Sequence, residues 1–176
     1  EGYGVLIEAL VREADAEFLY GTAASGLKRS GGRWSVDPLG EVDGVVLAVP
    51  APDAARLLSD SVRSAAQCAA QIPLASSVVV ALALPHDAGL PQNSGILVAT
   101  GEDLSAKAFT LSSRKWPHLA ERPVALARAS FGRFGDDALV DASEADLIAL
   151  ARADLATVTG VDAEPVAAFV QRWHGG

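Results

Sequence analysis

The chain has 176 residues, about the length of one domain, and carries 14 Lys and Arg against 22 Asp and Glu, a formal net charge of −8. This acidic balance gives no attraction to nucleic acid or anionic lipid, and no apolar run approaches the roughly 18 residues that a membrane helix needs. The single cysteine, Cys68, excludes an internal disulfide and a thiolate zinc cluster.

In chain order, apolar residues at helical spacing first predict an amphipathic helix over Tyr3–Ala14. A small meander follows, with turns at Ser30-Gly31-Gly32 and Asp37–Gly40. Its last strand is a continuous apolar run, which is typical of a strand buried on both faces. The strands predicted for this meander are Glu17–Ser25, Arg33–Val36 and Gly44–Val49.

Two helical runs, Ala54–Leu58 and Ser61–Gln71, lie between this meander and a region of different texture. From Ala75 onward short apolar segments alternate with Gly, Pro and charged turns, which predicts one antiparallel sheet with loops at Pro85–Pro91 and Arg114–Pro123. The predicted strands of this sheet are Ser76–Leu84, Ile96–Ala99, Ala106–Ser112 and Val124–Phe131, and Pro165–Trp173 is a last candidate strand.

The segment Ser143–Val158 is predicted to be a helix packed on one face of that sheet. Ser143 is a suitable N-cap with Asp146 three residues later, and Gly160 is a natural C-terminal stop. The fold class is therefore a mixed α+β one, in which a partial meander and a sheet covered by helices form different packing units. Because the chain begins at Glu1 and contains no Met, we expect it to be cut from a larger protein.

Tests for self-contained active sites are negative. The pair Gly21 and Gly26 lacks the directly following Lys of a phosphate-binding loop, since Lys28 comes one residue late. No G-x-G-x-x-G dinucleotide motif is present. Ser130 lacks the preceding Gly of a hydrolase elbow. The histidines are too scattered to predict a metal site; they are His86, His118 and His174. We therefore expect no catalytic residue and no metal ligand in this chain.

One loop carries a more specific pattern. Lys107-Ala-Phe-Thr-Leu-Ser-Ser-Arg-Lys-Trp-Pro-His118 resembles the corresponding stretch of bacterial protoporphyrinogen and coproporphyrinogen oxidases, flavoenzymes of the amine-oxidase superfamily. The weaker matches agree with it in order and spacing; they are Gly4–Leu10, Asp43–Leu58, Ser94–Ala99, Arg128–Arg133 and Val170–Trp173. The similarity runs over nearly the whole chain and covers only the middle of such an enzyme.

This resemblance implies residues 1–58 as part of the FAD-binding domain and 59–176 as most of the substrate-binding domain. It implies oxidation of a porphyrinogen to the porphyrin in haem biosynthesis, with molecular oxygen as the final acceptor. Because the glycine motif lies outside the chain, we expect this segment alone neither to retain FAD nor to be active. The parent enzyme would be cytoplasmic, or peripheral at the membrane.

Site residues can be transferred only where positions match. Ala24 corresponds to a small residue whose backbone contacts the adenine end of FAD, and Trp173 to an aromatic residue near the flavin. The strand that lines the porphyrinogen cavity is implied to include Ser94, Gly95 and Leu97. The substrate propionates need cations, for which Arg114 and Lys115 are candidates, although solvated loop cations are the alternative interpretation.

Two other functions stay open from the sequence. The Asp43–Leu58 region is shared with FAD amine oxidases that act on amines or carotenoids, and a non-catalytic ligand-binding domain is the second alternative. The residues also do not separate coproporphyrinogen III from protoporphyrinogen IX as substrate, and they do not define an oligomeric state.

Overall fold

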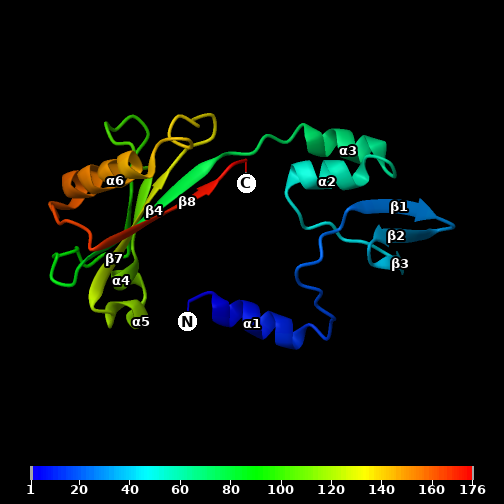
Figure 1. Cartoon of the computed structure of the whole chain (residues 1–176), viewed down its shortest axis with the longest axis horizontal. Helices are drawn as coiled ribbons and strands as arrows, with labels where there is room; N and C mark the ends of the chain where they lie inside the picture. The colour runs from blue at the N-terminus through cyan, green and yellow to red at the C-terminus, as the bar shows by residue number, and fades with distance from the viewer. Residues whose placement is uncertain (1, 176) are drawn as a thin grey trace. The chain divides into compact units, whose positions relative to one another are not determined.

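The computed structural model describes residues 2–175 and combines helices with antiparallel sheets, which confirms the α+β prediction (Figure 1). The chain forms two compact units, here called the first unit (Tyr3–Leu74) and the second unit (Ala75–Gly176, to which the two residues before Tyr3 are also assigned). This division falls later in the chain than the predicted boundary after Leu58. Which functional domain each unit represents remains a prediction.

The first unit contains a three-stranded antiparallel meander in the order β1-β2-β3. Gly31 and Gly32 form the first turn with φ of 58° and 87°, the left-handed conformations that a tight hairpin needs and that glycine adopts without strain. The elements of this unit are α1 (Gly4–Glu13), β1 (Gly26–Ser30), β2 (Arg33–Asp37), β3 (Gly40–Val42), α2 (Ala51–Leu58) and α3 (Arg63–Ala70).

A small apolar cluster holds the meander and the α2–α3 pair together. Leu27 and Val36 from the meander and Leu57 from α2 are its buried members, and the Ser61 hydroxyl donates to the Leu27 carbonyl. The helix α1 was correctly predicted, but none of its residues is buried. Its apolar stripe therefore lies exposed.

Two predicted strands of the first unit are wrong. Glu17–Ser25 is irregular, and the first strand begins only at Gly26. Gly44–Val49 is extended but is not part of a sheet, and Val46 is 93% exposed. An apolar run becomes a buried strand only where neighbouring strands take up its backbone hydrogen bonds, and no strand within residues 2–175 pairs with this segment.

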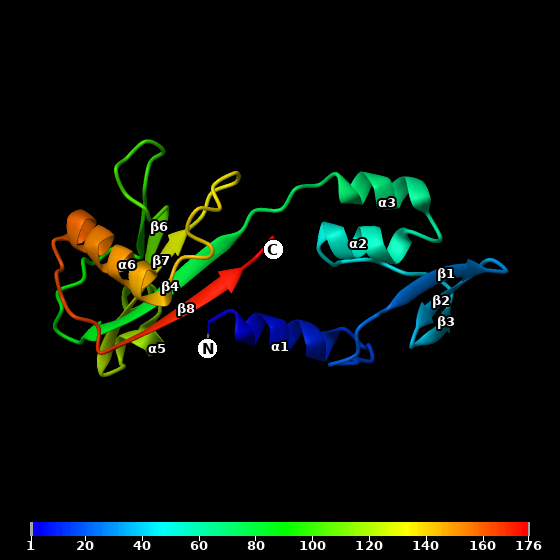
Figure 2. The same ribbon diagram turned by 45° about the horizontal axis from the view of Figure 1, so that its top comes forward.

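The second unit is built on a five-stranded sheet in the order β5-β6-β7-β4-β8 (Figure 2). Every neighbouring pair is antiparallel, which confirms the predicted sheet. The central strands β4 and β7 are the longest, and β5 and β8 form the two edges. The bounds are β4 (Ser77–Pro85), β5 (Gly95–Leu97), β6 (Ala108–Leu111), β7 (Val124–Phe131) and β8 (Ala167–Trp173).

The predicted covering helix is α6 (Glu144–Thr159). The backbone N–H of Asp146 donates to the Ser143 hydroxyl at 3.1 Å, and Gly160 ends the helix in the left-handed conformation at φ 75°. Leu147, Ala151 and Leu155 are buried against alternate residues of the sheet, in one continuous core. The helix thus closes one face of the sheet.

The segment Arg114–Pro123, predicted to be a loop, instead contains the short helices α4 (Ser112–Lys115) and α5 (Pro117–Ala120). The strand β6 ends at Leu111, opposite Ala127 of β7. Beyond that point the Ser113 hydroxyl of α4 accepts the N–H of Leu126 at 2.8 Å. A side chain therefore replaces the missing strand as the partner of β7.

No helix within residues 2–175 is long and apolar enough to cross a membrane.

Candidate functional site

The two faces of the five-stranded sheet differ in burial. Along β4 and β7, alternate side chains such as Leu82 and Phe131 are buried beneath α6. The residues between them point the other way because successive side chains of a strand alternate. We call this second side the open face; in β4 it carries Val79, Ala81 and Ala83, all half-buried.

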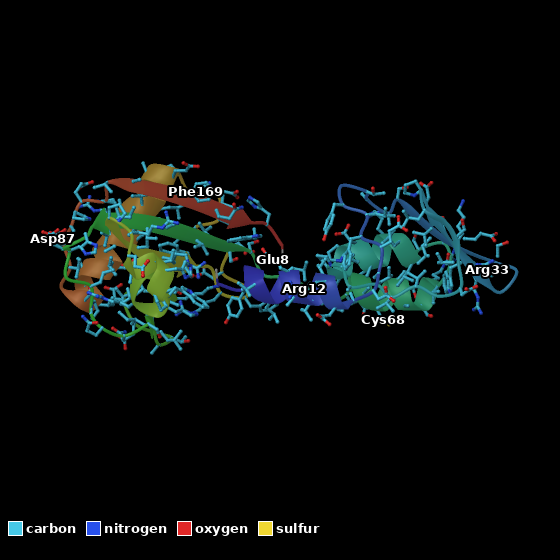
Figure 3. The ribbon with its side chains drawn as sticks, turned by 90° about the horizontal axis from the view of Figure 1, so that it is seen from below. Glu8, Arg12, Arg33, Cys68, Asp87 and Phe169 are labelled. Carbon is cyan, nitrogen blue, oxygen red and sulfur yellow. The ribbon has the colours of Figure 1, made fainter. Side chains whose placement is uncertain are left out.

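Strand register aligns two neighbouring rows of open-face residues. The first row is Gly95, Thr110, Arg128, Ala81 and Phe169, and the second row is Leu97, Ala108, Ser130, Val79 and Gln171. At the edges, Leu97 is 89% exposed and Phe169 of β8 (Figure 3) is 64% exposed. The face is thus a broad surface of mainly small and apolar residues, whose polar members are Thr110, Arg128, Ser130 and Gln171.

The predicted substrate residues of β5 all lie at one edge of this sheet. Leu97 belongs to the open face, and the Ser94 carbonyl accepts the N–H of Leu111 at 2.9 Å. A Cβ atom on Gly95 would stand 2.5 Å from the Phe109 carbonyl oxygen, so only glycine fits against β6 there. Ser94 and Gly95 thus lie beside the end of β6, and Leu97 lies opposite Ala108 at its beginning.

The predicted cations Arg114 and Lys115 follow that same end of β6, on α4. Arg114 is already partly engaged, since its Nε and Nη2 donate to the Leu90 carbonyl at 3.2 and 2.8 Å. A guanidinium has further N–H donors that these bonds leave available. The Lys115 ammonium lies 5.5 Å from the ring centroid of Trp116, within cation–π range. Substrate binding by either cation remains a prediction.

Arg114 also lines a mixed polar pocket of about 300 Å³ between α4 and the loop after β4, with His86, Asp87 and Ser113. Within residues 2–175, no three His, Cys, Asp or Glu side chains are grouped as metal ligands would be.

The two predicted flavin contacts lie in different units. Ala24 packs on the apolar cluster of the first unit, and no hydrogen bond within residues 2–175 engages its backbone. That backbone is therefore free for the kind of contact implied. Trp173, 45% exposed, is the last residue of β8 and lies opposite Ser77 on the open face. Both flavin-contact assignments stay predictions.

Sequence reasoning missed Arg128, which lies in the middle of the open face on the central strand β7. The signal was present in the sequence. Ala125, Ala127 and Ala129 are alternate small apolar residues of β7, so a charged residue between them belongs on the opposite side of the strand. Arg128 is exposed there.

A family model described as flavin containing amine oxidoreductase matches residues 1–175. The chain therefore belongs to this family of flavin-containing oxidoreductases.

Curated relatives narrow the similarity. The chain is 48% identical to coproporphyrinogen III oxidase of Mycobacterium leprae and 45% identical to that of Mycobacterium tuberculosis (strain ATCC 25618 / H37Rv), over 98% of this chain in both cases. It spans only 38% of the length of these relatives. Among solved structures, a putative protoporphyrinogen oxidase from Exiguobacterium sp. 255-15 superposes with a TM-score of 0.79 at 27% identity, covering 99% of this chain and 39% of the other.

Proposed function

We propose that this chain is the middle part of an oxygen-dependent flavoenzyme that oxidises coproporphyrinogen III to the porphyrin in haem biosynthesis. The similarity to coproporphyrinogen III oxidases over 98% of the chain carries this proposal. Protoporphyrinogen IX is the alternative substrate. Solved amine oxidases such as putrescine oxidase share the fold at only 19% identity, which supports no substrate assignment.

The open face supports the proposal on physical grounds. A porphyrinogen is an apolar macrocycle with propionate side chains, and it needs a broad apolar surface with a few cations. Small apolar residues such as Ala81 and Ala108 lie on the strands beside β7, while Leu97 and Phe169 stand at the edges of the face. A macrocycle laid on this surface would cover apolar side chains that are otherwise left in water.

We assign residues 59–176, which include the whole second unit, to the substrate-binding domain, and residues 1–58 to part of the FAD domain. When bound, FAD supplies the acceptor for hydride from the macrocycle and is restored by oxygen. Ala24 and Trp173 would contact it. The open face would hold and orient the macrocycle and keep water from it, while Arg114 and Lys115 remain candidates for its propionates. No residue of this chain is proposed to transfer a proton.

The test is activity of the full-length protein. Purified with FAD, it should convert coproporphyrinogen III in air to a fluorescent porphyrin faster than it converts protoporphyrinogen IX, and it should not oxidise diamines. Activity with amines and none with porphyrinogens would overturn the proposal.

The isolated 176-residue chain provides a second test. We expect it to elute from gel filtration without flavin and to show no turnover with added FAD, because the chain contains no glycine-rich phosphate-binding motif. Stoichiometric flavin binding by this chain would refute the domain assignment.

A further inference from the structure

We infer that Arg128 binds a propionate carboxylate of the macrocycle and is a specificity-determining residue for porphyrinogens rich in carboxylates. The inference rests on the proposed function and adds to it a residue that the sequence pattern of the Ser112–His118 loop does not include. It is carried by the place of Arg128 on the open face and by the state of its side chain.

Arg128 occupies the centre of the first row. Its neighbours across the strands are Ala81 on β4 and Thr110 on β6, both shorter than an arginine. The guanidinium is therefore the largest and the only charged group at the middle of an apolar surface. A flat ligand lying on this face would meet the cation within its own outline.

No carboxylate of the sheet neutralises this cation. None of the five strands contains an Asp or Glu. The only other charged strand residue is Arg172, which faces α6 and donates to the carbonyls of Val140 and Ala142 at 3.0 and 2.7 Å. In a chain of net charge −8, an isolated cation on an apolar face provides charge complementarity to an anionic ligand.

Three other cations of the second unit are bound to the protein itself. Arg133 donates to the Val98 carbonyl at 3.1 Å, Lys107 donates to the Gly132 carbonyl, and Arg152 pairs with Glu164 at 2.6 Å. Arg128, by contrast, has no side-chain hydrogen bond or ion pair within residues 2–175. Its guanidinium therefore makes no polar contact that holds the fold together.

An arginine matches a carboxylate through two parallel N–H···O bonds, and apolar surroundings strengthen such a pair. Coproporphyrinogen III carries a propionate on each pyrrole ring, whereas protoporphyrinogen IX carries propionates on only some of them. An additional cation beneath the macrocycle thus favours the ligand with more carboxylates.

The experiment uses the full-length protein loaded with FAD, as wild type and as Arg128→Gln, Arg128→Lys and Arg122→Gln. Arg122 is an exposed arginine of the same unit outside the sheet and serves as the matched control. Coproporphyrin III and its tetramethyl ester, which has no carboxylates, are titrated by fluorescence. Steady-state kinetics with coproporphyrinogen III run in parallel.

Arg128→Gln should raise the Kd of the free acid about 10- to 100-fold, the loss typical of a charge-assisted hydrogen bond, and should leave the Kd of the ester unchanged. KM should rise with little change in kcat. Arg128→Lys should recover part of the affinity because the charge is kept without the fork geometry. Arg122→Gln should bind both ligands as the wild type does.

An unchanged acid Kd in Arg128→Gln would overturn the inference. Equal weakening of acid and ester would also overturn it, because that result indicates a packing role instead of a carboxylate contact. Failure of the proposed function looks different: the wild type would then oxidise no porphyrinogen, while the dependence of acid binding on Arg128 could still be measured.

Discussion

The two units bury their apolar residues to different extents. In the second unit, 18 buried residues from β4, β6, β7, β8, α6 and their loops form one core. In the first unit the buried cluster contains only Leu27, Val36 and Leu57. Large apolar side chains such as Ile7, Leu10 and Val46 lie exposed there.

This difference shows that the two units are stabilised in different ways. The second unit is held by its own core, because α6 covers one face of the sheet completely enough to leave Leu147 and Ala151 at 0% exposure. The first unit depends mainly on local structure: tight turns, short helices and a hydrogen-bonded meander. Local structure without burial contributes little stability.

The largest effect is expected when the two units are produced as separate chains. A chain of residues 75–176 should fold cooperatively, whereas a chain of residues 3–74 should not, because its buried cluster is too small to offset the conformational entropy of folding. Circular dichroism and urea unfolding of both chains measure this. A sigmoidal unfolding transition of the 3–74 chain would contradict the comparison.

A leucine-to-alanine substitution made in the core of each unit tests the difference in burial further. Leu82→Ala should cost about 4 kcal/mol, near the upper end for buried leucines, because Leu82 is 1% exposed in the middle of the sheet. Leu57→Ala should cost about 2 kcal/mol, since its cluster can partly collapse. Native-state hydrogen exchange measures the free energy of unfolding of each unit separately. Equal losses of stability in the two variants would show that the two cores are equally well packed.

The next largest loss of stability is expected when a buried polar contact is removed. The carboxylate of Asp154 on α6 accepts the backbone N–H of Ala106 at 2.7 Å, and both residues are buried. Asp154→Ala leaves that N–H without a partner and should cost about 1–3 kcal/mol. The control is Asp162→Ala, an exposed carboxylate 3.9 Å from Arg152, with a change within about 0.5 kcal/mol. Urea unfolding compares them, and similar values would refute a structural role for Asp154.

The N-cap of α6 contributes less. Ser143→Ala removes the acceptor of the Asp146 N–H and should cost about 1 kcal/mol. Thr157→Ala, at an exposed position of the same helix, should be neutral or slightly stabilising because alanine is the better helix former. Thermal unfolding distinguishes the two variants, and a neutral Ser143→Ala would mean that water replaces the cap.

The smallest stability effect is expected on the open face. Leu97→Ala should change the free energy of unfolding by no more than about 0.5 kcal/mol, because Leu97 is 89% exposed. It should nevertheless raise KM for a porphyrinogen in the full-length enzyme. Calorimetry and steady-state kinetics separate the two readouts. A destabilised variant with normal KM would place Leu97 in the fold instead of the binding surface.

The sequence was most informative where local and long-range signals agree. Ser143, Gly160 and the apolar stripe of α6 all predict one helix, and the alternation in β7 agrees with its place in the sheet. Prediction failed for Gly44–Val49, because an apolar run specifies a need for neighbours without supplying them. It also failed for α4, where helix formation follows from the ending of β6 and from the Ser113 contact with Leu126.

The candidate site follows the same rule. Gly95 and Leu97 were found through a matching motif, and the register then placed Leu97 on the open face. Arg128 begins one of the weaker matching segments, Arg128–Arg133, which assigned it no role, and its isolation becomes visible only when the neighbouring strands are aligned beside it. Arg114 was predicted to bind a propionate or to be a solvated loop cation, and neither prediction included its bonds to the Leu90 carbonyl, which come from a loop distant in sequence.

The alternation of β7 also constrains how this region can evolve. Loops around the sheet can gain or lose residues with little consequence, but a single insertion or deletion between Val124 and Arg128 would shift the frame of the strand by one. Arg128 would then point into the core beneath α6, and the alanines would point outward. Folding and ligand recognition would be lost in the same event. The length of this strand therefore cannot change by one residue without also changing the position of Arg128.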